Sequence, residues 1–328
     1  MVIRRIGREF VKWAMDQADP KRYRQAGQLE CFFDDTQIEV SGRNFEGAKI
    51  NYEGNMALGW QTLWVGPFLA DGVLGSPGDV SSELPRLLEE NGHLWAKQEA
   101  YLYADSGSSA GTYLRCIADR FGQWSVSYNK WKGSLERQVE GFADSYWSKA
   151  IERRGRKGET VWEQYAWLRH QPEGMSEAVQ YAVARCRGEG ELLWRYSFIA
   201  THAHDGTAQA AFERHRLKGE YERRFGELLN DLDLHHPPCS SLAANRVYYA
   251  LATLAYNILQ ALKLIWMPVE EQSHRVRTLI HRLLLIPVEI KRHARQFVAC
   301  FFLPFHAERW WRQFIEILLP RCRLAASG

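Results

Sequence analysis

Two short apolar runs in the sequence each end in an aspartate, and a third carboxylate stands in a later stretch of helical character. Residues 31–33 precede Asp34, and the strand-like run 100–104 precedes Asp105. Glu222 lies among basic residues that favour a helix. Two carboxylates at strand ends and one on a later helix can converge on a pair of Mg²⁺ ions, which prefer oxygen ligands to Cys or His. The pattern therefore favours an α/β fold with a carboxylate metal site.

Each of these carboxylates also has a simpler interpretation. Asp34 is typical of a turn or a helix N-cap, and the adjacent Asp35 is the alternative ligand. Asp105 precedes Ser-Gly, a common turn sequence. Glu222 stands four residues after Lys218, the spacing of a surface ion pair on a helix. We keep Asp34, Asp105 and Glu222 as the predicted ligands of two Mg²⁺ ions, for which Mn²⁺ is a substitute.

The strings around these residues resemble the group 1 DDE transposases of bacterial insertion sequences, in particular the family numbered thirteen-eighty. The two aspartate strings are common by themselves, whereas the string around the glutamate, in order after both, is more specific. The resemblance covers about residues 29–320 and rests on Phe33–Thr36, Tyr103–Gly107, Lys218–Glu222, Glu227–Leu232, Ala243–Asn245 and Ile290–Arg295.

The family's third motif reads Tyr, two residues, Arg, three residues, Glu, six residues, Lys. Here those positions hold His215, Lys218, Glu222 and Leu229, so only the glutamate is retained. The resemblance implies that Lys218 contacts a DNA phosphate beside the scissile bond, although a lysine lacks the bidentate fork of arginine. His215 can still donate a hydrogen bond to DNA.

The resemblance further implies a reaction and its partners. A metal-activated water would hydrolyse the phosphodiester at the end of an insertion sequence, and the freed 3′-OH would attack target DNA. The partner is double-stranded DNA, both terminal inverted repeats and target, held by a homodimer. Two other classes stay open: an RNase H-like nuclease that cuts without joining, and an inactive relic that only binds DNA.

Charge supports a polyanionic partner. The 328 residues carry a formal net charge of +3, but from Glu271 onward ten Lys or Arg face four Asp or Glu, a net +6. Arg223 and Arg224 extend from the expected helix of Glu222 toward DNA or water. A basic C-terminal region beside an acidic catalytic region suits binding to DNA. The simpler interpretation of the basic C-terminal region is a helix face exposed to solvent.

Composition limits the class and the compartment. The hydrophobic share of 46% and the charged share of 25% are those of a folded chain. The six cysteines form no Cys-x-x-Cys pair, which argues against a zinc ribbon or a disulfide scaffold. The opening residues lead into no apolar core of a signal peptide, so we expect a cytoplasmic, nucleoid-associated protein. Residues 247–267 are long and apolar, but a stripe of Asn257, Gln260 and Lys263 favours a buried helix over a membrane span.

The order of three strands, helix, strand, helix and strand, read together with the resemblance, predicts an RNase H-like core interrupted by a mostly-β insertion domain. Because full members of the family have a longer N-terminal DNA-binding region, the chain is expected to be shortened at that end. The expected organisation is a helical remnant at 1–28, the first part of the core at 29–130, the insertion at 131–212, the catalytic helix and rest of the core at 213–270, and a basic helical region at 271–328.

Several element boundaries are also predicted. Residues 63–69 read as one strand, and residues 216–225 belong to one continuous helix that carries Glu222 and, one turn earlier, Lys218. The segment 131–210 is expected to form a separate, largely β layer, because a stretch this long is not a plain loop.

Overall fold

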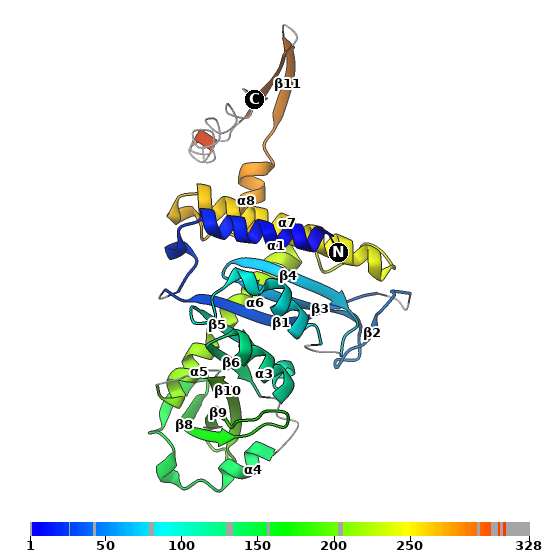
Figure 1. Ribbon diagram of the computed structural model, residues 1–328. Coiled ribbons are helices and arrows are strands. Elements are labelled where there is room, and N and C mark those ends of the chain that lie inside the picture. The colour runs from blue at the N-terminus through cyan, green and yellow to red at the C-terminus, as the bar shows by residue number, and fades with distance from the viewer. Residues whose placement is uncertain are drawn as a thin grey trace.

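The computed structural model describes residues 2–25, 27–41, 44–78, 82–128, 134–155, 158–202, 206–293, 296–302, 308 and 311–312. Within these residues, ten strands form one mixed sheet, and helices pack on it (Figure 1). This arrangement confirms the predicted α/β class.

The first six strands form the half of the sheet that carries the two aspartates. Strand β3 runs antiparallel to β1, β2 and β4, whereas β5 is parallel to β1 and to β6. Because both faces of β1 are covered, its first five residues are all buried. Four of them are apolar, and the other, Glu30, is paired with Arg214 at 3.0 Å. The bounds are β1 (Leu29–Glu39), β2 (Lys49–Ile50), β3 (Met56–Val65), β4 (Phe68–Gly75), β5 (Ala100–Ala104) and β6 (Gln123–Ser127).

The segment expected as an insertion is rich in strands, but they extend the central sheet and do not form the separate layer that we expected. Strand β10 pairs with β6, and β9, β8 and β7 follow outward in antiparallel order. The free edge of β6 provides the hydrogen-bonding groups that make this continuation favourable. The bounds are β7 (Ile151–Arg154), β8 (Thr160–His170), β9 (Val179–Gly188) and β10 (Arg195–His202).

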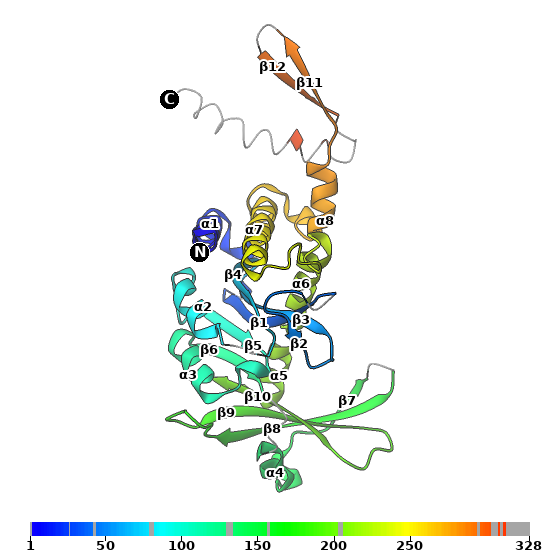
Figure 2. The ribbon, with the colours of Figure 1, turned by 90° about the vertical axis from the view of Figure 1, so that its right-hand side faces the viewer.

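Side chains that alternate along β1 enter two different cores. Cys31 and Phe33 point into the core built with α1, α2 and α3, whereas Phe32 points into the core built with α6 and α7. Figure 2 shows α2 and α3 on one side of β1 and β5, and α6 on the other. The helices are α1 (Val2–Gln17), α2 (Leu84–Asn91), α3 (Gly111–Arg120), α4 (Ser134–Glu140), α5 (Ala208–Arg216), α6 (Gly219–Asp231), α7 (Leu242–Ala261) and α8 (Val276–Leu279).

Helix α7 lies beside α1 and against β4 (Figure 1), and it continues as a π-helical turn, Leu262–Trp266. Asn257 on this helix is buried and binds the backbone of Leu69 through both its amide oxygen and its amide nitrogen. Of the helices in the described ranges, none is both long and apolar enough to cross a bilayer. The helix predicted within residues 247–267 is present, but it is buried on one side only: Asn257, Gln260 and Lys263 are buried, whereas Val247, Leu251 and Ile258 are 39%, 50% and 43% exposed.

The predictions for residues 63–69 and for the C-terminal region were wrong. Residues 63–69 do not form one strand, because Gly66, with φ of 55°, turns the chain between β3 and β4. The C-terminal region is not wholly helical, since β11 (Val288–His293) and β12 (Gln296–Phe301) pair as a hairpin that projects from the body (Figure 2). Residues 313–328 of the basic region lie outside the described residues.

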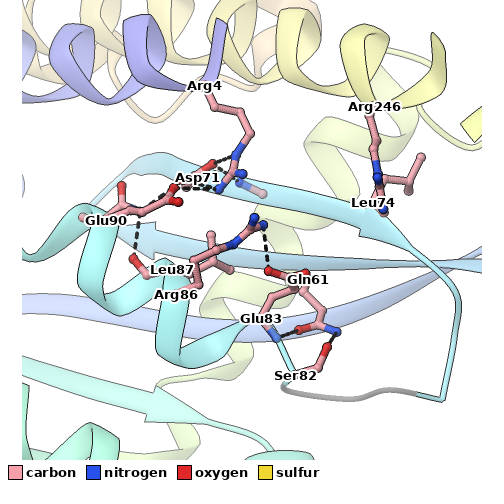
Figure 3. Close-up of polar contacts among 12 residues, drawn as sticks. Arg4, Gln61, Asp71, Leu74, Ser82, Glu83, Arg86, Leu87, Glu90 and Arg246 are labelled. Carbon is pink, nitrogen blue, oxygen red and sulfur yellow. Dashed lines mark hydrogen bonds and ion pairs between the residues drawn. The ribbon is translucent and has the colours of Figure 1, made fainter. Parts of the chain in front are cut away.

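A cluster of charges on Asp71 of β4 fixes α1 to the sheet (Figure 3). Arg4 donates two hydrogen bonds to the Asp71 carboxylate, at 2.6 and 2.7 Å, and Arg8 donates a third at 2.9 Å. The amide of Asn91 adds another contact at 3.2 Å, and Glu90 accepts from both arginines. The Asp71 side chain is only 1% exposed, so its charge depends on these partners.

We predict that Asp71→Ala lowers the free energy of unfolding by about 3 kcal/mol, because it leaves two largely buried guanidinium groups with one shared carboxylate. Urea unfolding followed by circular dichroism measures the change. Asp16→Ala, which removes the exposed partner of Lys12, is the control and should cost less than about 1 kcal/mol. Equal losses in the two variants would contradict the anchoring role of Asp71.

Candidate functional site

Parallel pairing places the two aspartates side by side. The ladder of β1 and β5 ends with Phe33 opposite Ala104, and Asp34 and Asp105 are the next residue of each chain segment. Alternation turns both carboxylates to the face where α6 packs. The sequence folds this way locally because the apolar runs before each aspartate pair in the interior of the sheet.

The ammonium of Lys218 lies between these carboxylates. Its Nζ is 2.7 Å from Oδ1 of Asp105 and 3.5 Å from Oδ1 of Asp34. The Lys218 side chain is 9% exposed, against 17% for Asp34 and 54% for Asp105. Burial works against the ammonium, but the charges of Asp34 and Asp105, with a smaller contribution from Glu222, keep the pKa of Lys218 above its usual value.

Asp34 and Asp35 occupy different environments. Burial raises the pKa of Asp34 to about 7; the charge of Lys218 opposes this rise, and the nearby Asp105 adds to it. Asp35 points to the opposite face of the sheet, where burial alone raises its pKa to about 6 and its Oδ1 has no hydrogen-bond partner among the described residues. The structure therefore brings Asp34, and not Asp35, to Lys218.

His215 lies inside the protein and not at a DNA-facing surface. Its Nδ1 and Nε2 are 2.7 and 2.8 Å from the hydroxyl oxygens of Ser125 and Ser127, so both ring nitrogens are engaged. Burial, followed by the charge of Lys218, lowers the pKa of His215 to about 4. The two serines were not predicted as site residues; their signal is the Ser-x-Ser spacing on β6, which puts both hydroxyls on one face.

The helix expected to carry Lys218 and Glu222 is divided between α5 and α6. The N–H of Lys218 donates to the carbonyl of His215 at 3.0 Å, and the N–H of Tyr221 donates to the carbonyl of Lys218 at 2.8 Å. These are bonds to the third residue back, which tighten the backbone locally. Gly219, the poorest helix former after proline, begins α6 and makes this break inexpensive.

Glu222 stands apart from the aspartate pair. Tyr221 beside it packs on Phe32 in the core, which turns the exposed Glu222 outward. Among the described residues, no three His, Cys, Asp or Glu side chains lie close enough together to hold a metal ion. The structure thus joins Asp34 and Asp105 through Lys218 but does not bring Glu222 to them.

The two arginines after Glu222 differ in their surroundings. Arg223 has a side chain that is 79% exposed, with Glu220 at 3.9 Å. Arg224 donates to the carbonyl of Gly66 at 2.6 Å and stacks on Tyr221, so it ties α6 to the β3–β4 turn. Arg223 is the more available of the two for a partner.

Comparison with known proteins identifies one family. The family model described as transposase DDE domain group 1 matches residues 69–307. The matched range contains Asp105, Lys218 and Glu222 and begins after Asp34. No curated protein matches the chain.

The lowered pKa of His215 predicts a pH dependence of stability. Since the folded protein holds the ring neutral down to about pH 4 and the unfolded chain binds a proton near pH 6.5, stability should be complete above pH 6.5 and fall as the pH drops toward 4. The loss attributable to this group is about 3 kcal/mol. Urea unfolding at several pH values should show a smaller loss for His215→Gln than for wild type, whereas the exposed His236→Gln should follow wild type.

Proposed function

Because the chain belongs to the transposase DDE domain group 1 family, we propose that it cuts DNA at the ends of an insertion sequence and joins the ends to target DNA. The family indicates DNA transposition and recombination as the general process. The divalent metal, the strand-transfer step and the insertion-sequence ends are the parts that we infer. We also infer that β1, β3, β5 and β6, with their helices, are an RNase H-like core.

The observation that carries the proposal is the convergence of Asp34 and Asp105 on one cation. Two carboxylate oxygens from neighbouring strands approach the same Lys218 ammonium, so this position already binds positive charge. Hard oxygen donors in this arrangement suit Mg²⁺, which proteins commonly bind through one or two carboxylates plus water and substrate phosphate. Two such ions supply Lewis acidity to the attacking and leaving oxygens of a phosphodiester.

In this proposal the chain positions the reacting groups. Asp34 and Asp105 would hold the metal at the edge of the core, and Glu222 would complete the ligand set when DNA is bound. The break between α5 and α6 gives the start of α6 a place to move, since the N–H groups of Lys218, Glu220 and Tyr221 bond to the third residue back and so interrupt the regular α-helical pattern. The exposed Arg223 contacts the DNA backbone.

The proposed partner is double-stranded DNA. Neutralisation of its phosphates by Lys and Arg supplies affinity that does not depend on sequence. Because both ends of an element must be held together for joining, we infer that two copies of the chain act on one DNA molecule.

The function is tested by cleavage of DNA that carries the ends flanking the gene. We expect Mg²⁺- or Mn²⁺-dependent cuts that chelation with EDTA abolishes. Asp105→Asn should reduce the cleavage rate by at least about 100-fold, since even second-shell changes at metal sites cost 10- to 100-fold. DNA binding in a gel-shift assay should persist, and Asp119→Asn, an exposed aspartate on α3, should cleave as wild type does.

Joining is measured separately with precut ends and a plasmid target. Covalent end–target products would support strand transfer. Cleavage without any joined product would identify a nuclease, and retention of full cleavage by Asp105→Asn would contradict the proposed site.

A further inference from the structure

We propose that Lys218 is the resident counter-ion of the catalytic carboxylates, and that a divalent metal ion must displace its ammonium to bind. This inference rests on the proposed function, because it concerns the same pair of aspartates. It assigns to Lys218 a role in metal uptake that precedes any contact with DNA.

The geometry places the ammonium on the oxygens that the metal needs. Nζ of Lys218 contacts Oδ1 of both Asp34 and Asp105, at 3.5 and 2.7 Å. A cation held by these two carboxylates would compete with the ammonium for their oxygens. The lysine side chain is almost wholly buried, so water does little to screen its charge from an incoming ion.

The backbone holds the lysine in this position. The Lys218 N–H is bonded to the carbonyl of His215, whose ring is held by Ser125 and Ser127 on β6. Lys218 therefore enters the site from a segment fixed to the strand next to Asp105. Because the fold holds the Lys218 ammonium at the two aspartates, a metal ion that binds there has to compete with it.

Charge balance explains why both cations cannot stay. Two carboxylates and one ammonium leave one net negative charge, whereas a divalent ion added without displacement would meet a positive charge a few ångströms away. Like charges at that distance repel strongly inside a protein. The His215 side of Lys218 is anchored to β6, so the segment that would shift when the ammonium leaves begins at Gly219, the first residue of α6.

Displacement of the ammonium would have a second consequence. A released Lys218 is free to contact phosphate, the role expected from its position in the third motif. Metal binding would thus make Lys218 available to contact DNA. Before the metal binds, the ion pair with Asp34 and Asp105 would keep Lys218 away from DNA.

The test is calorimetric titration of Mn²⁺ into the DNA-free protein at pH 8. Lys218→Met removes the competing charge while keeping a long side chain, and Mn²⁺ should bind on the order of tenfold more tightly than to wild type. Lys218→Gln, which keeps a hydrogen-bond donor without the charge, should change affinity in the same direction. Lys218→Arg, which keeps the charge, should bind no more tightly than wild type.

Lys263→Met is the matched control, because Lys263 is equally buried but lies in the π-helical turn after α7. It should leave the Mn²⁺ affinity unchanged. Asp105→Asn should weaken Mn²⁺ binding at least tenfold and so locate the ion at this site. Thermal unfolding gives a second readout, since added Mn²⁺ should raise the Tm of Lys218→Met more than that of wild type.

Unchanged or weaker Mn²⁺ binding in both Lys218→Met and Lys218→Gln, with binding still lost in Asp105→Asn, would overturn the counter-ion role and leave the metal site intact. Mn²⁺ binding that is insensitive to Asp105→Asn would overturn the metal site of the proposed function, and this inference with it.

Discussion

The parallel register of β1 and β5 is the constraint on which the site depends. It sets Asp34, in the middle of β1, beside Asp105, which follows the last residue of β5. Two adjacent carboxylates that are partly removed from water repel each other, so the fold needs a positive charge there. Lys218 supplies it, and the raised pKa of Asp34, which burial causes first of all, shows that the compensation is incomplete. A site with this residual demand for positive charge is suited to a divalent ion.

The break between α5 and α6 connects this electrostatic demand to the helices. A continuous helix would keep Lys218 and Glu222 one turn apart on one side, as an ordinary surface ion pair. In the structure the lysine points inward to the aspartates, and Glu222 points to solvent next to the buried Tyr221. The same break separates α5, which is anchored to β6 through His215, from α6, which carries Glu222, the third predicted ligand.

The other helices and strands hold in place the part of the sheet that carries Asp34 and Asp105. The Asp71 cluster ties α1 to β4, and α7 packs against the same strand, so the first half of the sheet is covered by helices. On the other side of the aspartates, β10 adds to β6 and carries the sheet on through β7. The two serines that hold His215 therefore lie on an internal strand, which limits their movement.

The α/β class, the end of the strand before Asp105 and the family could be read from the sequence, because apolar runs, turn residues and motif order are local properties. The expectation that Asp34 also ends a strand was wrong, because β1 continues to Glu39 by pairing with β3. The sequence did not determine that Lys218 turns inward, that both nitrogens of His215 are engaged, or that the β-rich segment extends the central sheet. The sequence-based prediction of a helical C-terminal region also failed for β11 and β12, which pair as strands. Each of these depends on partners distant in sequence: a buried charge takes the nearest opposite charge, and a strand edge takes the nearest free edge. Which partners are nearest follows from how the whole chain packs in three dimensions.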